Sequence, residues 1–143
     1  MSLQETTEFF ARYRDNFNRL DGDAVADTWN VPSSIADSHG EGDAARITTY
    51  TDDASMRANM HALCDVYRRN GFERAEFELV DHIALGAQHA FAHVHWTLRR
   101  ADGSELQSFR TGYQLARTAG GVKALMAVAY EESIATMTPH AAQ

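Results

Sequence analysis

Cysteine, basic residues and long apolar runs are all scarce in this chain of 143 residues. The single cysteine, Cys64, excludes an internal disulfide and suits a reducing compartment. Lysine and arginine together number 13 against 20 aspartates and glutamates, and a net charge of −7 argues against a basic nucleic-acid-binding surface. The longest apolar run, Ala124–Tyr130, is far shorter than the ~20 residues that a membrane span needs. We therefore expect neither nucleic acid nor a membrane as a partner.

Motifs for metal binding and nucleophilic catalysis are also missing. His93 and His95 alternate along a predicted strand and share a face, but no nearby carboxylate or cysteine completes a metal-ligand set. No serine–histidine–aspartate or cysteine–histidine order can be read from the sequence. The neighbours of Cys64 predict a small buried side chain, because a nucleophilic thiol would need an activating partner. We expect no metal and no cofactor.

Length and composition indicate one globular domain. Hydrophobic residues make up 44% of the chain and charged residues 23%, which is ordinary globular usage. The segment Met1–Phe10 has two glutamates and no apolar run, so we expect no secretory signal and a cytoplasmic location. We expect the domain to span residues 1–137 and the residues 138–143 to form a loose tail.

The hydrophobic period changes once along the chain, at Gly71. Before it, helical spacing predicts helices over about 3–20, 24–29 and 52–70, with Tyr13 on the apolar face of the first. Short strands are predicted near 34–37 and 46–50. After Gly71 the period is two, and glycine-containing turns separate strands at about 74–85, 89–100, 105–117 and 122–131. Helices followed by an antiparallel meander predict an α+β fold.

The helices are too few to cover both faces of a long sheet. A sheet that curls over them leaves a cavity at its open end, which is a natural site for a small molecule. On the strand over 89–100, we expect Val94, Trp96 and Leu98 to pack under the helices. The opposite face is predicted to hold Phe91, His93, His95 and Phe109 and to meet a second copy of the chain.

The order of these elements over about residues 3–133 resembles the nuclear transport factor 2-like superfamily. The segments Ala11-Arg12-Tyr13, Asp21-Gly22-Asp23 and Ile35-Ala36-Asp37, together with Trp29, are similar to its ketosteroid isomerase and polyketide cyclase (SnoaL-like) branch. The resemblance implies a cone-shaped, curved antiparallel sheet wrapped over three N-terminal helices, the cystatin-like α+β roll. It also implies a homodimer, since relatives commonly form one.

The resemblance also implies roles for individual residues. In the isomerase, a tyrosine on the first helix donates a hydrogen bond to the substrate oxygen, and an aspartate on the first strand moves the proton. Tyr13 and Asp37 fall at those positions without a gap, and Trp29 matches an aromatic residue that flanks the tyrosine. The isomerase also has a protonated aspartate on a late strand. Thr111 or Gly112 stands there, so one strong donor to the substrate oxygen is missing.

Both catalytic candidates have a structural alternative. Tyr13 is either a core tyrosine with its hydroxyl at the pocket wall or a donor to the ligand. Asp37 is either a base inside the cavity or a turn former that binds local backbone. We expect the ligand pocket to be lined by Trp29, His39, Trp96 and Tyr113. The predicted function is an isomerase or lyase acting on a hydrophobic carbonyl compound, or alternatively a non-catalytic ligand-binding or dimerising module.

Overall fold

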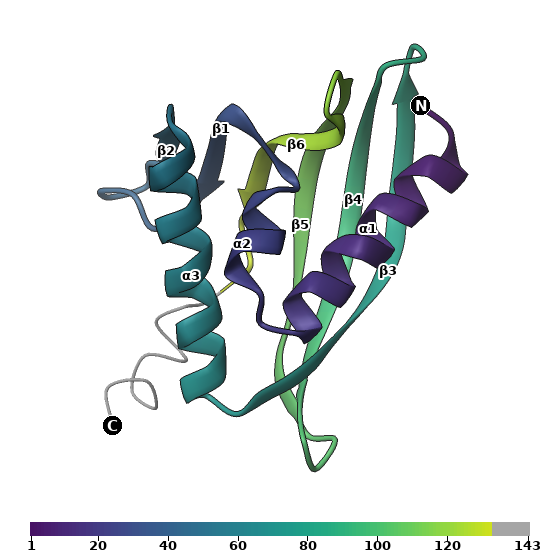
Figure 1. Ribbon diagram of the computed structural model, residues 1–143. Coiled ribbons are helices and arrows are strands. Elements are labelled where there is room, and N and C mark those ends of the chain that lie inside the picture. Colours follow the sequence, from purple (N-terminus) through teal and green to yellow (C-terminus); the bar gives the residue numbers. More distant parts are fainter. Residues whose placement is uncertain (133–143) are drawn as a thin grey trace.

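The computed structural model describes residues 1–132, in which three helices pack against one face of a six-stranded sheet (Figure 1). The tail expected over 138–143 lies outside these residues. The elements in chain order are α1 (Leu3–Asn18), α2 (Gly22–Ala26), β1 (Trp29–Asp37), β2 (Arg46–Tyr50), α3 (Asp53–Arg69), β3 (Phe72–Leu85), β4 (His89–Arg100), β5 (Glu105–Thr118) and β6 (Gly121–Ala129). Among these described residues, no helix is long and apolar enough to cross a membrane.

Each helix begins at a side chain that accepts a hydrogen bond from its first turn. Ser2 Oγ accepts from the backbone N–H of Glu5 at 3.1 Å, and Asp21 Oδ1 accepts from that of Ala24 at 3.0 Å. Asp52 Oδ1 does the same for Ser55 at 2.7 Å. These caps satisfy backbone donors that have no partner within the helix.

The second helix is shorter than the predicted range of 24–29, and Trp29 belongs to a strand instead. Helix α2 ends at Ala26, where the Thr28 hydroxyl donates to the carbonyl of Val25 at 2.6 Å. The carbonyl of Thr28 then accepts from the backbone N–H of Ala124 at 2.9 Å, which joins the chain to β6. Threonine and tryptophan favour strands, so sheet pairing prevails over a helix of one turn.

The strand order in the sheet is β2-β1-β6-β5-β4-β3. The predicted antiparallel meander from β3 to β6 is confirmed. The position of the two short strands was not predicted: β1 pairs in parallel with β6 and antiparallel with β2. In this register Asp37 lies beside Ala129 on one side and Arg46 on the other. Asp37 and Ala129, which are far apart in the sequence, therefore lie side by side in the sheet.

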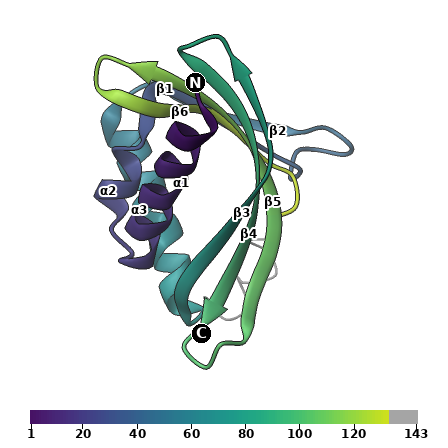
Figure 2. The same cartoon turned by 90° about the vertical axis from the view of Figure 1, so that its right-hand side faces the viewer.

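The sheet curls around the helices, so its concave face forms the core (Figure 2). Val94, Trp96 and Leu98 are buried on that face, as predicted, while His93 and His95 alternate with them on the other. Phe109 was predicted on the outer face, but it pairs with Trp96 and is 5% exposed. The prediction was wrong because it did not include the register between β4 and β5, which sets the face of each residue.

Candidate functional site

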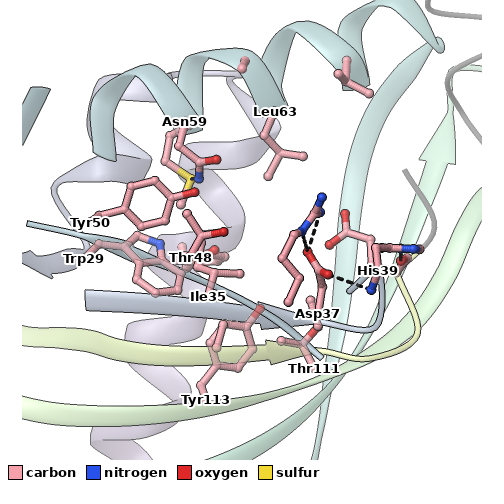
Figure 3. A pocket seen from close by; sticks show the side chains of 18 residues that line it. Trp29, Ile35, Asp37, His39, Thr48, Tyr50, Asn59, Leu63, Thr111 and Tyr113 are labelled. Atoms are coloured by element: carbon pink, nitrogen blue, oxygen red, sulfur yellow. Dashed lines mark hydrogen bonds and ion pairs between the residues drawn. The ribbon is translucent and has the colours of Figure 1, made fainter. Parts of the chain in front are cut away.

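A cavity of about 300 Å³ lies between α3 and the sheet, near β1, β2 and β6. Figure 3 shows Asn59 and Leu63 of α3 on one side of this space, with Ile35 and Tyr113 from the sheet on the other. Much of the wall is apolar, with Ile35, Met60, Leu63, Val66, Ala127 and Ala129 among its lining residues. A cleft lined largely by apolar side chains, with some polar groups among them, is the usual form of a small-molecule site.

The cavity brings together most of the predicted site residues. Its lining includes Tyr13, Trp29, Asp37, His39 and Tyr113. Trp96 does not line it. That side chain borders a smaller cavity of about 50 Å³, and the two cavities share four lining residues, Tyr13, Leu63, Tyr113 and Glu132.

Three buried hydrogen-bond donors belong to the cavity wall. The hydroxyls of Tyr13 and Tyr113 lie on side chains that are 6% and 4% exposed, and burial raises the pKa of both well above the usual tyrosine value. Both phenols therefore keep their protons near neutral pH. Nε1 of Trp29, a residue 4% exposed, makes no hydrogen bond of normal geometry among the described residues, although its N–H is near enough to the Tyr13 hydroxyl to oppose part of the burial-driven rise in the pKa of that group. A buried donor left without an acceptor costs free energy, so a ligand acceptor would stabilise it.

Asp37 lines the cavity and also forms the local turn that the sequence offered as an alternative to a catalytic role. Its Oδ1 accepts from the backbone N–H of His39 at 2.9 Å. Its Oδ2 accepts from Nε and Nη2 of Arg46 at 3.1 and 2.7 Å (Figure 3). Burial raises the pKa of Asp37, but the hydrogen bonds from Arg46 and His39 outweigh it, and the net pKa lies below the usual value. Both carboxylate oxygens already have donors.

Glu132 is a site residue that the sequence did not reveal. It is partly buried and lines both cavities, and its Oε1 accepts a hydrogen bond from the Tyr67 hydroxyl at 2.6 Å. Burial raises the pKa of Glu132, and the nearby negative charge of Asp37 adds to that increase. In sequence, Glu132 follows Glu131 at the end of a strand, a pattern typical of solvated surface.

The late-strand position that holds an acid in the isomerase carries none here, as the sequence indicated. Thr111 is 3% exposed and lines the cavity, while Gly112 lies on the opposite face under the ring of Phe91. Within residues 1–132, no group of histidine, cysteine, aspartate and glutamate side chains could hold a metal ion. Cys64 is buried, and burial raises the pKa of its thiol to about 11, so it is a poor nucleophile.

Comparison with known protein families shows which family the chain belongs to. Residues 4–132 match the family described as NTF2-like protein (DUF6841). The chain belongs to this NTF2-like family. The predicted resemblance to the nuclear transport factor 2-like superfamily is thus confirmed. Comparison with the curated proteins gives no match.

Solved structures confirm the predicted fold of this NTF2-like chain. A domain of unknown function with a cystatin-like fold from Nostoc punctiforme superposes with a TM-score of 0.69 at 14% identity, over 93% of this chain and 80% of that one. A ketosteroid isomerase-like protein from Erwinia carotovora atroseptica gives 0.64 at 15% identity, over 92% and 96%. A protein from Thiobacillus denitrificans, named for the calcium/calmodulin-dependent protein kinase type II association domain, gives 0.65 at 17% identity, over 87% and 93%. At these identities the likeness concerns the fold alone.

Proposed function

We propose that this NTF2-like domain binds a small, mostly apolar carbonyl compound and moves a proton next to the carbonyl group, as an isomerase or lyase. The observation that carries the proposal is the set of three buried donors, Tyr13 Oη, Tyr113 Oη and Trp29 Nε1, at one cavity that also contains carboxyl groups. The fold shared with a ketosteroid isomerase-like protein supports it as an analogy.

The chemistry follows from where charge develops. When a base removes a proton from the carbon next to a carbonyl, negative charge moves onto the carbonyl oxygen. Neutral phenols such as Tyr13 and Tyr113 donate more strongly to that oxygen than to the uncharged carbonyl, so they stabilise the transition state more than the bound substrate. The resemblance to the isomerase nominates Asp37 as the base. The reaction needs no cofactor.

Binding of 2-tetralone, a small apolar ketone, tests the proposed function. We expect saturable binding in ligand-observed NMR. Each of Tyr13→Phe and Tyr113→Phe should weaken it by about 2- to 10-fold, the value of one hydrogen bond. Tyr130→Phe is the matched control, because the hydroxyl of Tyr130 bonds His93 and Tyr130 lies outside the cavity lining. No saturable binding, or the same affinity in all three variants, would contradict the proposal.

A second function, a dimerising module, is favoured by the outer face of the sheet. Ile83, Leu85 and Val128 are 54%, 47% and 40% exposed there, and the three described helices all lie against the other face (Figure 2). The fold shared with the protein named for an association domain also supports this proposal. Sedimentation at micromolar concentration should give twice the chain mass of 15.9 kDa. Val128→Asp, which places a charge on this outer face, should give a monomer. A wild-type monomer would exclude the dimer.

We also propose that the protein is cytoplasmic. The free thiol of Cys64 is 2% exposed and packs in the core, which suits a reducing compartment. Fractionation of cells that express the tagged protein checks this, and recovery outside the cytoplasm would contradict it.

A further inference from the structure

The main cavity contains two carboxyl groups in opposite environments. Asp37 is held by Arg46 and by the backbone of His39, whereas the Glu132 carboxyl receives one neutral hydrogen bond from Tyr67 and forms no ion pair among residues 1–132. When environments push the proton affinities of two neighbouring carboxyl groups apart, the groups have different roles in chemistry. The different hydrogen-bond environments of Asp37 and Glu132 therefore indicate different roles for the two carboxyl groups.

Asp37 is poorly suited to accept a proton. Protonation of its Oδ2 would break the ion pair with Arg46, and protonation of Oδ1 would oppose the hydrogen bond from His39. A carboxylate that accepts several hydrogen bonds in its charged form is a weak base. Its bonds instead hold the end of β1, the following turn and β2 in place.

Glu132 has the properties that Asp37 lacks. Its Oε2 has no hydrogen-bond donor among residues 1–132, and Oε1 has only the hydroxyl of Tyr67. The residue lines both cavities together with Tyr13 and Tyr113, the two phenols proposed to hold the carbonyl oxygen. A general base must share one enclosed space with the donors that stabilise the developing oxyanion.

We propose that Glu132, rather than Asp37, is the group that removes and returns the substrate proton. This inference rests on the proposed function. The carbon–hydrogen bond next to the carbonyl breaks, and its electron pair forms the carbon–carbon double bond of an enolate. The carbonyl π electrons move onto oxygen, which accepts hydrogen bonds from Tyr13 and Tyr113. The proton moves to the Glu132 carboxylate, which becomes a neutral acid and later returns a proton to carbon.

Tyr67 is then a positioning residue. Its hydroxyl donates to Oε1 of Glu132 from α3 and leaves Oε2 for the substrate. The other ionisable groups around Glu132 come from every adjoining element: Tyr13 on α1, Asp37 on β1, Arg46 on β2 and Tyr113 on β5. His39, which follows β1, places its Nε2 3.4 Å from the backbone carbonyl of Glu132.

The proposed step is measured as the exchange of the α-protons of 2-tetralone for deuterium in D₂O, which ¹H NMR follows as a loss of signal. The rate without protein is subtracted. Glu132→Gln should lower the exchange rate by about 100-fold or more, the usual contribution of a general base. Glu132→Asp, which withdraws the carboxyl by one methylene, should keep part of the rate. Glu131→Gln is the matched control and should leave the rate unchanged, because Glu131 is exposed and pairs with Arg110.

The pH profile separates Glu132 from Asp37. The wild-type exchange rate should fall as the pH drops through the pKa of Glu132, which lies above the usual glutamate value. In Asp37→Asn the rate should decrease less than in Glu132→Gln, and the midpoint should move to lower pH, because the negative charge of Asp37 raises the pKa of Glu132. Titration of the ¹³C-labelled Glu132 carboxyl in the wild-type protein should give the same midpoint.

Each contrary result has a distinct meaning. Full exchange in a folded Glu132→Gln protein, or an ordinary glutamate pKa for Glu132, overturns the inference. Binding of 2-tetralone without exchange overturns proton transfer by Glu132 and leaves ligand binding in place. No binding by the wild-type protein overturns the proposed function, and the role of Glu132 with it.

Discussion

Nε1 of Trp96 donates a hydrogen bond to Oη of Tyr113 at 2.9 Å. Because that oxygen accepts from Trp96, the proton of the Tyr113 hydroxyl is left for a different acceptor, either the neighbouring Tyr13 hydroxyl, whose pKa it lowers, or a ligand in the cavity. Hydrogen bonds in a chain polarise one another, so Tyr113 becomes a stronger donor. Trp96 therefore supports the cavity through Tyr113 without lining it.

The two tryptophans should respond differently to the same substitution. Trp96→Phe removes a buried hydrogen bond, whereas Trp29→Phe removes a buried N–H that has no partner among the described residues. The loss of ring volume is the same in both. Without ligand, Trp96→Phe should reduce the free energy of unfolding by about 1–2 kcal/mol more than Trp29→Phe. Urea unfolding measures the difference, and equal losses would show that the Trp96–Tyr113 bond contributes nothing to stability.

Phe10 should be a major contributor to stability. It is fully buried, and its ring centroid lies 4.9 Å from that of Tyr113 and 5.1 Å from that of Phe9. Phe10→Ala should cost about 3–5 kcal/mol by leaving a cavity in this aromatic cluster. Leu3→Ala on the same helix, where Leu3 is 58% exposed, should change stability by less than about 0.5 kcal/mol. Thermal and urea unfolding of the pair test this contrast.

The ion pair between Asp37 and Arg46 should give a defined pH dependence. The pKa of Asp37 is lowered in the folded protein, so its contribution to stability is present above the usual pKa near 3.8 and is lost as the pH falls through the folded value. Asp37→Asn should therefore be less stable than the wild type at neutral pH, and the difference should shrink in acid. Asp43→Asn, at an exposed loop position, is the control. A difference independent of pH would argue against the pair.

Glu132 should show the opposite dependence. Its pKa is raised in the folded protein, so the folded state binds a proton more tightly than the unfolded chain. The wild type should lose stability relative to Glu132→Gln as the pH rises from about 4.5 through the folded pKa. The urea midpoints of both proteins, measured across this pH range, show whether the stability difference between them grows or shrinks. A wild type that gains stability relative to Glu132→Gln would mean that the carboxyl prefers its charged form.

The main elements were predictable because their signals are local. Phe10, Tyr13 and Phe17 follow the helical period, and each lies in the core. The turns after Gly71 contain Gly86, Gly103 and Gly121, whose φ angles are 69°, 84° and 103°, a region that side chains other than glycine rarely enter. Period and turn chemistry thus sufficed for α1, α3 and the meander, but not for the bounds of α2.

The rest of the site depends on contacts between distant residues. The partner of Asp37 is Arg46, and the pairing of β1 with β2 brings the two together. No local sequence pattern predicts the register of that pairing. The burial of Glu132 requires β6 to lie beside β1 and requires Tyr67 to reach it from α3. A sequence read in short windows shows only an acidic strand end at this position.

The parallel pairing of β1 with β6 also determines when the cavity can form during synthesis. The hydroxyl of Ser38 donates to the carbonyl of Tyr130, a contact between residues 92 positions apart. Such distant pairs form late, because the entropy of closing the long loop is lost before the contact stabilises the fold. A nascent chain that has not yet released β6 from the ribosome lacks the strand that pairs with β1, so the wall of its cavity is incomplete. Any ligand of the cavity would therefore bind only after β6 has emerged.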